Sequence, residues 1–365
     1  MIVTRTPFRV TLGGGGTDLP SYYEKHGGFI FAMGIDKYMY VMTNPPGVDR
    51  KIRLHYTQSE VADHVDEIRH ELAREALRLN GIEDRMEISS MADVPAGTGM
   101  GSSSAYLVGL LAALHQYRRD YVSLEALAEE ACHIELTVLK KGIGKQDQYM
   151  AAFGGMTVLE IAKDGVVDVR PVQLRGGALA TLIAHTHIYY TGLVHNTVDV
   201  LADQNRAMRD DNHRRVTVED SLNAIKDLGY RILDAVQSED FDRWGLLLHE
   251  HWVNKKRMSD RISMSWIDQL YDEARTSYGV LGGKLIGAGG GGFLMLYCPS
   301  TSGKLEDYMQ ARGLPRLYYG LEREGAKVVA NVASTQSMIL HPNGHTATPA
   351  ATSRVTSAER VRDAV

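Results

Sequence analysis

Three clusters of glycine place the strongest constraint on how this chain can fold. They lie at residues 13–18 (GGGGTD), 95–104 (PAGTGMGSSS) and 287–292 (GAGGGG). An ordered glycine costs roughly 0.5–1 kcal/mol relative to alanine, because it loses the most backbone freedom on folding. Clusters of this kind therefore indicate places where the backbone must closely approach a ligand or another loop, which an ordinary turn does not require.

The stretch at 95–104 has the composition of a phosphate-binding loop. Glycines and three serines precede an apolar segment, Ala105–Tyr117, whose pattern predicts a helix. Free amides at a helix N-terminus bind anions, and serine hydroxyls can donate to phosphate or ligate a hard cation. The loop lacks the lysine of the Walker pattern, so it would be a cradle of another type. Taken alone, these residues are equally consistent with a glycine-rich turn capped by serine.

The stretch at 287–292 matches the letters of the dinucleotide-binding pattern G-x-G-x-x-G. That motif requires a helix directly after its last glycine. Here an apolar strand is expected instead, over Phe293–Cys298. The pattern therefore predicts a wide turn between two strands, with its backbone close to a ligand or another loop.

Three carboxylates stand out by their surroundings. Glu135 interrupts the apolar face of a helix expected from Ser123 to about Lys140, so it needs a metal, a cation or hydrogen-bond donors. Asp147 lies in a glycine-flanked loop, where it could serve chemistry or cap a helix. Asp18 follows the first glycine cluster, where an ionised carboxylate suits hydroxyl recognition or an ordinary turn.

Basic residues cluster at the end of another expected helix, 242–257. The segment His249–His251 has the wrong spacing for an H-E-x-x-H zinc site, so we interpret it as a polar helix face. Lys255, Lys256 and Arg257 end the helix, where positive charge suits the helix dipole. A role of these residues in binding a substrate phosphate is a second interpretation.

Length and periodicity predict two domains, over residues 1–180 and 181–336, because 365 residues exceed what one core usually serves. Strands are expected at 2–12, 29–43 and 51–56, and a helix over Val61–Leu79. Further helices are expected near 216–237 and 265–278. Residues 337–365, rich in Pro, Thr, Ala and Ser, are expected to form a flexible tail.

Composition excludes several classes of protein. A net charge of −5 argues against a general nucleic-acid binder. The N-terminal residues show no signal-peptide pattern, and the apolar run at 105–114 is too short to span a bilayer. Two cysteines cannot build a disulfide framework, so a reducing, cytoplasmic location is expected.

With these residues in view, the chain resembles the GHMP kinases, the family of galactokinase, homoserine kinase and mevalonate kinase. Pro7–Asp18, Pro95–Ala105 and Lys284–Phe293 are similar to its three motifs, in the same order. Within the family, a further likeness joins the chain to the D-glycero-D-manno-heptose 7-phosphate kinases. That likeness lies in TRTPFR (4–9), GGGTDLP (14–20), IGKQDQY (143–149) and WVNKK (252–256).

The resemblance implies roles for individual residues. Asp147 and Arg9 match the catalytic positions, and Ser103 and Glu135 match positions that hold magnesium. The ATP phosphates would be bound by the second motif: Pro95, Gly97, Thr98, Gly99, Met100, Gly101, Ser102, Ser103 and Ser104. The acceptor would be bound by Asp18, Gly15, Gly16, Thr17, Gly289, Gly290, Arg5 and Lys255. Galactokinases have Glu and His within the first motif where this chain has only glycines, which suits a larger sugar.

The resemblance also implies an α+β fold, with an N-terminal domain like that of ribosomal protein S5 and a C-terminal ferredoxin-like domain. The expected activity is ATP- and Mg²⁺-dependent phosphorylation of the anomeric hydroxyl of heptose 7-phosphate. Other sugar or cyclitol 1-kinases, and a non-catalytic sugar sensor, are the alternatives. The expected partner is a small-molecule sugar phosphate, without nucleic acid or membrane, and a homodimer stays open.

Overall fold

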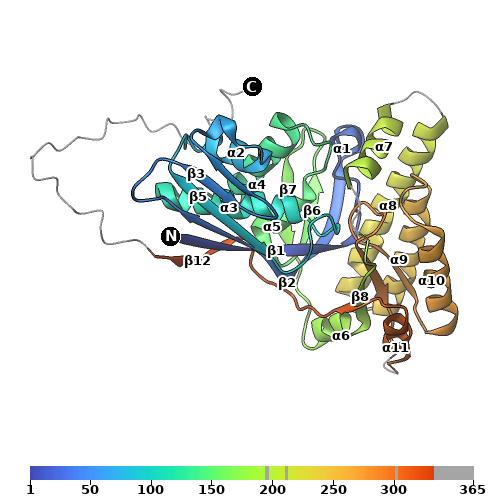
Figure 1. Ribbon diagram of the computed structural model, residues 1–365. Coiled ribbons are helices and arrows are strands. Elements are labelled where there is room, and N and C mark those ends of the chain that lie inside the picture. Colours follow the sequence, from blue (N-terminus) through green and yellow to red (C-terminus); the bar gives the residue numbers. More distant parts are fainter. Residues whose placement is uncertain (194–196, 210–212, 301–302, 333–365) are drawn as a thin grey trace, which may run out of the picture.

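The computed structural model describes residues 1–193, 197–209, 213–300 and 303–332. The chain folds as a mixed α+β protein with two sheets, one of eight strands and one of four (Figure 1). The predicted α+β class is therefore confirmed. The predicted tail, 337–365, lies outside the described residues.

The large sheet is built around two long neighbouring strands, β1 (Ile2–Gly13) and β2 (Gly28–Asn44), which pair antiparallel. The second half of β2 pairs with β5 (Met86–Ala92), which continues the sheet to β3 (Ile52–His55) and β4 (Ser59–Ala62). The first half of β2 pairs instead with β6 (Met156–Ile161), followed by β7 (Val167–Pro171). The strand expected at residues 2–12 is present as β1, and from Thr6 to Gly13 it is buried on both faces.

Helices pack against this sheet, and one of them begins at the end of the second glycine cluster. The apolar helix α3 (Ser102–Arg118) and the short helix α5 (Gln146–Phe153) both pack against β1 and β2. The helices α2 (Glu71–Leu79) and α4 (Leu124–Cys132) pack beside α3, and α1 (Pro20–His26) follows the first glycine cluster. Ser123 caps α4 by accepting a hydrogen bond from the amide of Ala126, as its sequence position favours.

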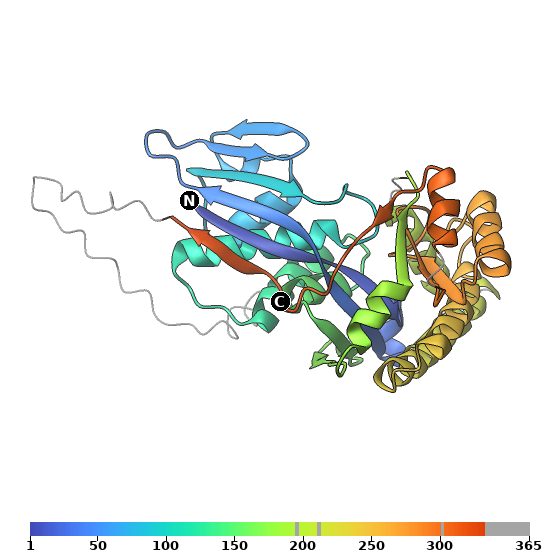
Figure 2. The same ribbon diagram turned by 90° about the horizontal axis from the view of Figure 1, so that it is seen from below.

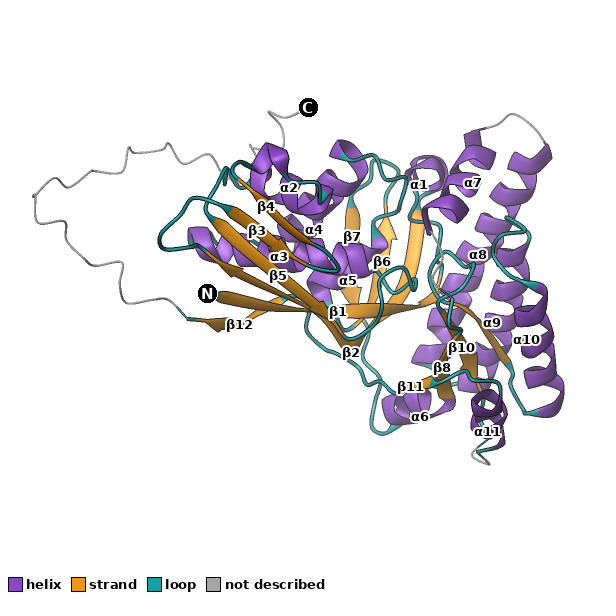
Figure 3. Ribbon diagram, in the orientation of Figure 1, coloured by secondary structure: helices purple, strands orange, loops and turns teal. Residues whose placement is uncertain are grey.

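The small sheet has the strand order β11-β8-β10-β9 and is antiparallel throughout. Its members are β8 (Thr186–Tyr190), β9 (Gly282–Leu285), β10 (Phe293–Tyr297) and β11 (Arg316–Leu317). In chain order this is 4-1-3-2, with helices inserted after the first and third strands, which is the ferredoxin-like arrangement. Figure 3 shows its helices: α6 (Ala178–His185), α7 (Thr197–Arg209), α8 (His213–Gln237), α9 (Phe241–Lys256), α10 (Ser265–Ser277) and α11 (Lys304–Ala311).

The chain ends its described part by returning to the large sheet. The strand β12 (Lys327–Asn331) pairs antiparallel with β1, and Figure 2 shows the two side by side. The boundary expected between residues 180 and 181 falls within α6, and it stays a prediction. No helix within the described ranges is both long and apolar enough to cross a membrane.

Two predicted helices are corrected. Of the segment Val61–Leu79, only Glu71–Leu79 is helical, because residues 59–62 pair as β4 with β3 and a single 3₁₀ turn follows. The helix expected from Ser123 to about Lys140 ends as an α-helix at Cys132 and continues as a π-helical turn, His133–Val138. Glu135 lies in that turn, and π-helical turns occur frequently at functional sites.

Candidate active site

The three glycine clusters meet at one cavity of about 770 Å³. Its wall includes parts of β1, of the loop before α3, of the loop before α5, and of α9 and the 286–288 turn. This volume lies within the range usual for small-molecule sites, roughly 300–1,000 Å³. Segments that are far apart in the sequence therefore form one enclosure.

The loop before α3 is shaped to present backbone amides. Gly97, Gly99 and Gly101 have φ angles of 74°, 81° and 81°, a region that other residues rarely adopt. The helix then starts at Ser102 without a side-chain cap, and its first turn lines the cavity. Uncapped amides and the helix dipole favour an anion at this position.

The third glycine cluster packs against this loop. A β-carbon added at Gly287 would lie 2.5 Å from the carbonyl oxygen of Gly99, and one added at Gly292 would lie 2.2 Å from that of Thr98. Both glycines also have positive φ. Only glycine allows this approach, so the close loop contact expected for the turn at 287–292 is present.

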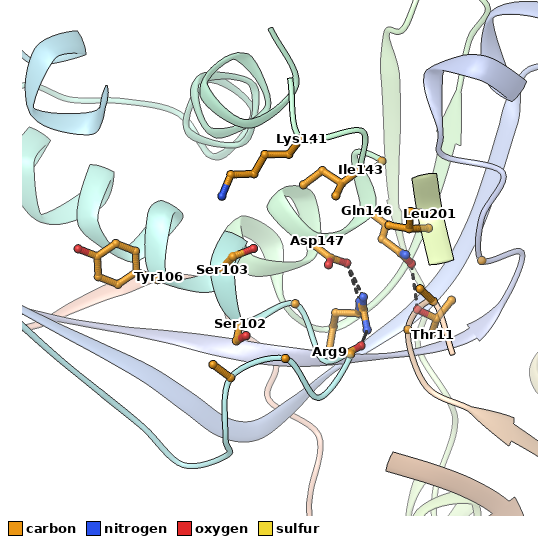
Figure 4. A pocket seen from close by; sticks show the side chains of 18 of the residues that line it. Arg9, Thr11, Ser102, Ser103, Tyr106, Lys141, Ile143, Gln146, Asp147 and Leu201 are labelled. Carbon is orange, nitrogen blue, oxygen red and sulfur yellow. Dashed lines mark hydrogen bonds and ion pairs between the residues drawn. The ribbon is translucent and has the colours of Figure 1, made fainter. Parts of the chain in front are cut away.

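Arg9 and Asp147 form an ion pair on the cavity wall (Figure 4). Arg9 donates through Nε to Oδ1 of Asp147 at 2.7 Å, and through NH1 to the carbonyl oxygen of Gly99 at 2.5 Å. Asp147 lies in the first turn of α5, so the loop predicted for it is wrong, because the helix begins at Gln146. Arg9 therefore links the Asp147 carboxylate to the glycine loop before α3.

Glu135 is fully buried behind the start of α3. Its carboxylate accepts hydrogen bonds from Ser103 Oγ (3.1 Å), Ser104 Oγ (2.6 Å) and Gln148 Nε2 (2.6 Å). Burial raises the pKa of Glu135, and the hydrogen bond from Ser104 opposes that shift. The donors expected for a carboxylate on an apolar face are present, and no ion pair involves Glu135 within the described part of the chain.

Asp18 also lines this cavity, next to the loop before α5. It accepts from the amides of Gly16 (3.2 Å) and Gln146 (3.1 Å), while burial raises its pKa. Gly144 passes so close that an added β-carbon would lie 1.9 Å from Asp18 Oδ2. Nearby, Thr11 Oγ1 donates to Gln146 Oε1 at 2.9 Å (Figure 4). This part of the cavity wall offers carboxylate, amide and hydroxyl groups suited to polyol recognition.

The structure places most of the predicted residues on the cavity wall. Those that line it are Pro95, Gly97, Gly99, Gly101, Ser102, Ser103, Gly15, Gly16, Asp18, Arg9, Asp147 and Lys255. Behind the wall lie Thr98, Met100, Ser104, Glu135 and Thr17, all buried. Thr17 donates to the carbonyl oxygens of Gly14 and Phe29, which is a structural contact.

Three residues predicted for substrate binding have other surroundings. Gly289 and Gly290 pack against Ile262, whose carbonyl oxygen accepts from the amide of Gly290 at 2.8 Å. Arg5 pairs with Glu322 at 2.7 Å and lies over the ring of Tyr38, so its charge is engaged away from the cavity wall. The sequence could not show this, because Glu322 is remote in the chain.

Several cavity residues were missed by the sequence analysis. His251 was interpreted as part of a polar helix face, but it is buried and lines the cavity. Lys284, within the third motif, also lines it, as do Lys141, Tyr106 and Leu201 (Figure 4 for the last three). Lys284 could have been identified from the sequence, because it is a charged residue next to apolar residues in an expected strand.

Two family models match the chain in the expected order. The model described as "GHMP kinases N terminal domain" matches residues 63–155, and "GHMP kinases C terminal" matches residues 232–313. The first match contains the loop before α3 and both Glu135 and Asp147. The second contains α9, β9 and the third glycine cluster.

Individual relatives share the same likeness. The chain is 26% identical over 313 residues to a D-glycero-alpha-D-manno-heptose 7-phosphate kinase of Campylobacter jejuni, covering 82% of this chain and 90% of that protein. A solved structure of a D-glycero-D-manno-heptose 1-phosphate kinase from Bacteroides thetaiotaomicron is similar with a TM-score of 0.74 at 21% identity, covering 91% and 100%. Galactokinase of Lactococcus lactis with galactose gives a TM-score of 0.70 at 17% identity, covering 89% and 94%.

Proposed function

Because this chain belongs to the GHMP kinase superfamily, and is thus an ATP-dependent phosphotransferase with an alcohol acceptor, we propose that its acceptor is D-glycero-D-manno-heptose 7-phosphate. The product would be the 1,7-bisphosphate, formed by transfer to the anomeric hydroxyl in the cytoplasm. The curated relative from Campylobacter jejuni, named for that heptose, supports the choice of sugar.

The observation that carries the proposal is the position of Asp147 between two kinds of binding group. On one side is the glycine loop with its uncapped helix start, suited to the phosphates of ATP. On the other is Asp18 with its neighbours, suited to sugar hydroxyls. Phosphoryl transfer requires mainly positioning and charge stabilisation, so a carboxylate between donor and acceptor is where a base is needed.

In this proposal Asp147 accepts the proton of the attacking hydroxyl. Its Oδ1 is held by Arg9, while its Oδ2 receives no hydrogen bond from the described residues and can accept one from substrate. The guanidinium of Arg9 would stabilise negative charge on the transferring group. Its contact with the carbonyl of Gly99 fixes it relative to the ATP loop.

The residues behind the loop fit a magnesium ion by their chemistry. Ser103 Oγ, the Glu135 carboxylate and the unpaired, buried Gln148 Oε1 are hard oxygen donors. The described residues contain no cluster of three His, Cys, Asp or Glu side chains for a metal. An ion held by Ser103 and Glu135 would therefore need its other ligands from nucleotide and water. When bound, Mg²⁺ would neutralise charge on the β- and γ-phosphates.

The test is a panel of acceptors with ATP and Mg²⁺, measured by coupled ADP release. The panel contains heptose 7-phosphate, the unphosphorylated heptose, free hexoses, a cyclitol and mevalonate. We expect the highest kcat/KM for heptose 7-phosphate, and a product whose new phosphorus resonance couples to the anomeric proton. A higher value for a free sugar or cyclitol would favour the alternative, another GHMP 1-kinase. ATP consumption unaffected by every acceptor would favour a sugar sensor.

A further inference from the structure

A group of basic side chains lines the cavity on the side formed by α9 and β9. It consists of Lys255 and His251 from α9 and Lys284 from β9, and we call it the basic cluster. Their exposed fractions are 6%, 1% and 2%, and all three belong to the cavity wall. Buried basic groups that face a cavity are rare unless an anion accompanies them.

Among the described residues, no carboxylate forms an ion pair with this cluster. Within the part of the chain that the structure describes, Lys255 Nζ donates to the carbonyl oxygens of Leu285 (3.0 Å) and Gly287 (2.5 Å) and to no side chain. Across the described ranges, the Lys284 ammonium group makes no hydrogen bond or ion pair, and neither ring nitrogen of His251 has a hydrogen-bond partner. In contrast, Lys256, the next residue on α9, pairs with Asp268 at 2.9 Å.

This arrangement is costly without a ligand. Burial lowers the pKa of Lys255 to about 7, with a further contribution from the charge of Arg9. Burial and the charge of Lys255 lower the pKa of Lys284, and burial with Lys284 lowers that of His251. Burial and nearby positive charge thus disfavour the protonated form of all three groups, and a bound dianion would offset both effects.

We infer that Lys255, Lys284 and His251 form a second phosphate-binding subsite, which holds the phosphate that the acceptor already carries. The assignment of that phosphate to the acceptor rests on the proposed function. The glycine loop and the start of α3 already provide an anion site suited to the nucleotide, whereas the basic cluster comes from other elements, α9 and β9. The same phosphate chemistry could come from the terminal phosphate of ATP, so the experiment must separate the two sources.

The other basic residues considered for this role are engaged elsewhere. Arg5 is paired with Glu322 and Lys256 with Asp268. Neither they nor Arg257 is among the residues that line the cavity. Among the described Lys and Arg residues that line the cavity, Arg9 and Lys141 are paired with Asp147 and Glu71, which leaves the two lysines of the basic cluster without a carboxylate partner.

The test compares Lys284→Met and Lys255→Met with the wild type, using heptose 7-phosphate and the free heptose as acceptors. Lys226→Met is the matched control, because Lys226 is half-buried and lies outside the cavity wall. A charge-assisted hydrogen bond corresponds to about ten- to a hundredfold in binding. We expect kcat/KM to fall by about that factor for the phosphorylated sugar and little for the free sugar, with the control unchanged. Lys284→Met removes no hydrogen bond, so it tests the subsite even if Lys255→Met perturbs the fold.

A second arm titrates inorganic phosphate into each protein and follows its ³¹P resonance. The wild type should bind more phosphate than the Lys255→Met, Lys284→Met double variant. Unchanged sugar discrimination in the variants would overturn the inference, even if the wild type prefers heptose 7-phosphate. An equal loss with both sugars would assign the cluster to the nucleotide and overturn the acceptor assignment. If the wild type uses neither sugar, a loss of phosphate binding in the double variant retains the subsite and rejects only the proposed substrate, whereas retained binding rejects the subsite.

Discussion

Arg9 holds Asp147 by one oxygen only: its Nε and NH2 atoms lie 2.7 and 2.6 Å from Oδ1. The second oxygen, Oδ2, has no donor among the described residues. An ion pair of this form orients a carboxylate and leaves one of its oxygens for a ligand. The same guanidinium contacts the carbonyl of Gly99, so the orientation of Asp147 depends on the glycine loop.

The contact between the second and third glycine clusters should be sensitive to a single methyl group. In Gly287→Ala, the new β-carbon would meet the backbone of Gly99 at about the 2.5 Å separation found here. We expect a loss of about 2–5 kcal/mol, from backbone strain at positive φ and from overpacking. Nucleotide affinity should fall as well, because the two loops must separate.

Gly81→Ala is the control for that substitution. Gly81 has a φ of 65°, and nothing lies within 4 Å of an added β-carbon. It should lose only the strain contribution, about 1–2 kcal/mol, and retain nucleotide binding. Denaturant unfolding and nucleotide titration of both variants provide the comparison. Equal losses of stability, with unchanged nucleotide affinity, would show that the contact does not shape the phosphate site.

Glu135→Gln should weaken magnesium activation by at least about tenfold, because it removes the charged oxygen that we propose as a magnesium ligand. Stability should also fall, by about 1–3 kcal/mol, since the new amide cannot accept from all three donors that surround it. The matched control is Ser104→Ala, which removes one of these hydrogen bonds from a buried position. This variant retains the carboxylate, so it should lose stability while its magnesium dependence of ADP release changes far less than that of Glu135→Gln. Identical magnesium curves for wild type and Glu135→Gln would leave Glu135 with a structural role alone.

The stability of the protein should depend on pH through Lys255. Its pKa of about 7 in the folded protein compares with 10.5 in the unfolded chain, so the unfolded state binds more protons between these values. The destabilising contribution of Lys255 is complete below pH 7 and is relieved as the pH rises, by about 1.4 kcal/mol per pH unit. Lys255→Met removes this titration. The other basic groups that line the cavity, Lys284, His251 and Arg9, are present in both proteins.

The free energy of unfolding of both proteins, measured from pH 7.5 to 9.5, tests this directly. The variant should be relatively more stable at the lower pH, and its advantage should decrease toward the higher pH. Parallel pH profiles would show that Lys255 stays protonated in the folded protein.

The sequence was informative where local pattern and chemistry agreed. The apolar segment after Gly292 correctly predicted a strand–turn–strand unit. The dinucleotide-binding motif, which the glycines match by letter, would have required a helix at that position. Glu135 was correctly expected to be buried, because it interrupts an apolar helix face. The sequence left a metal, a cation or hydrogen-bond donors open as its partners, and the structure shows three donors. The α+β class and the kinase family followed from motif order.

Tertiary contacts decided the remainder. Residues 59–62 form a strand only because β3 provides its partner, which no local pattern reveals. His251 and Lys284 are adjacent in the cavity but separated by thirty-two residues in sequence, so their joint role could not be read from either segment. Arg5 lies beside the first motif in sequence, yet Glu322 neutralises it.

The most direct test of the account is the turnover of Asp147→Asn. The amide keeps the shape of the side chain but cannot accept the hydroxyl proton, so kcat for acceptor-dependent ADP release should fall by about 10²–10⁴-fold. Nucleotide affinity and the thermal unfolding midpoint, measured on the same preparation, should remain close to wild type. A variant with those properties and wild-type kcat would contradict the assignment of Asp147 as the base that activates the acceptor.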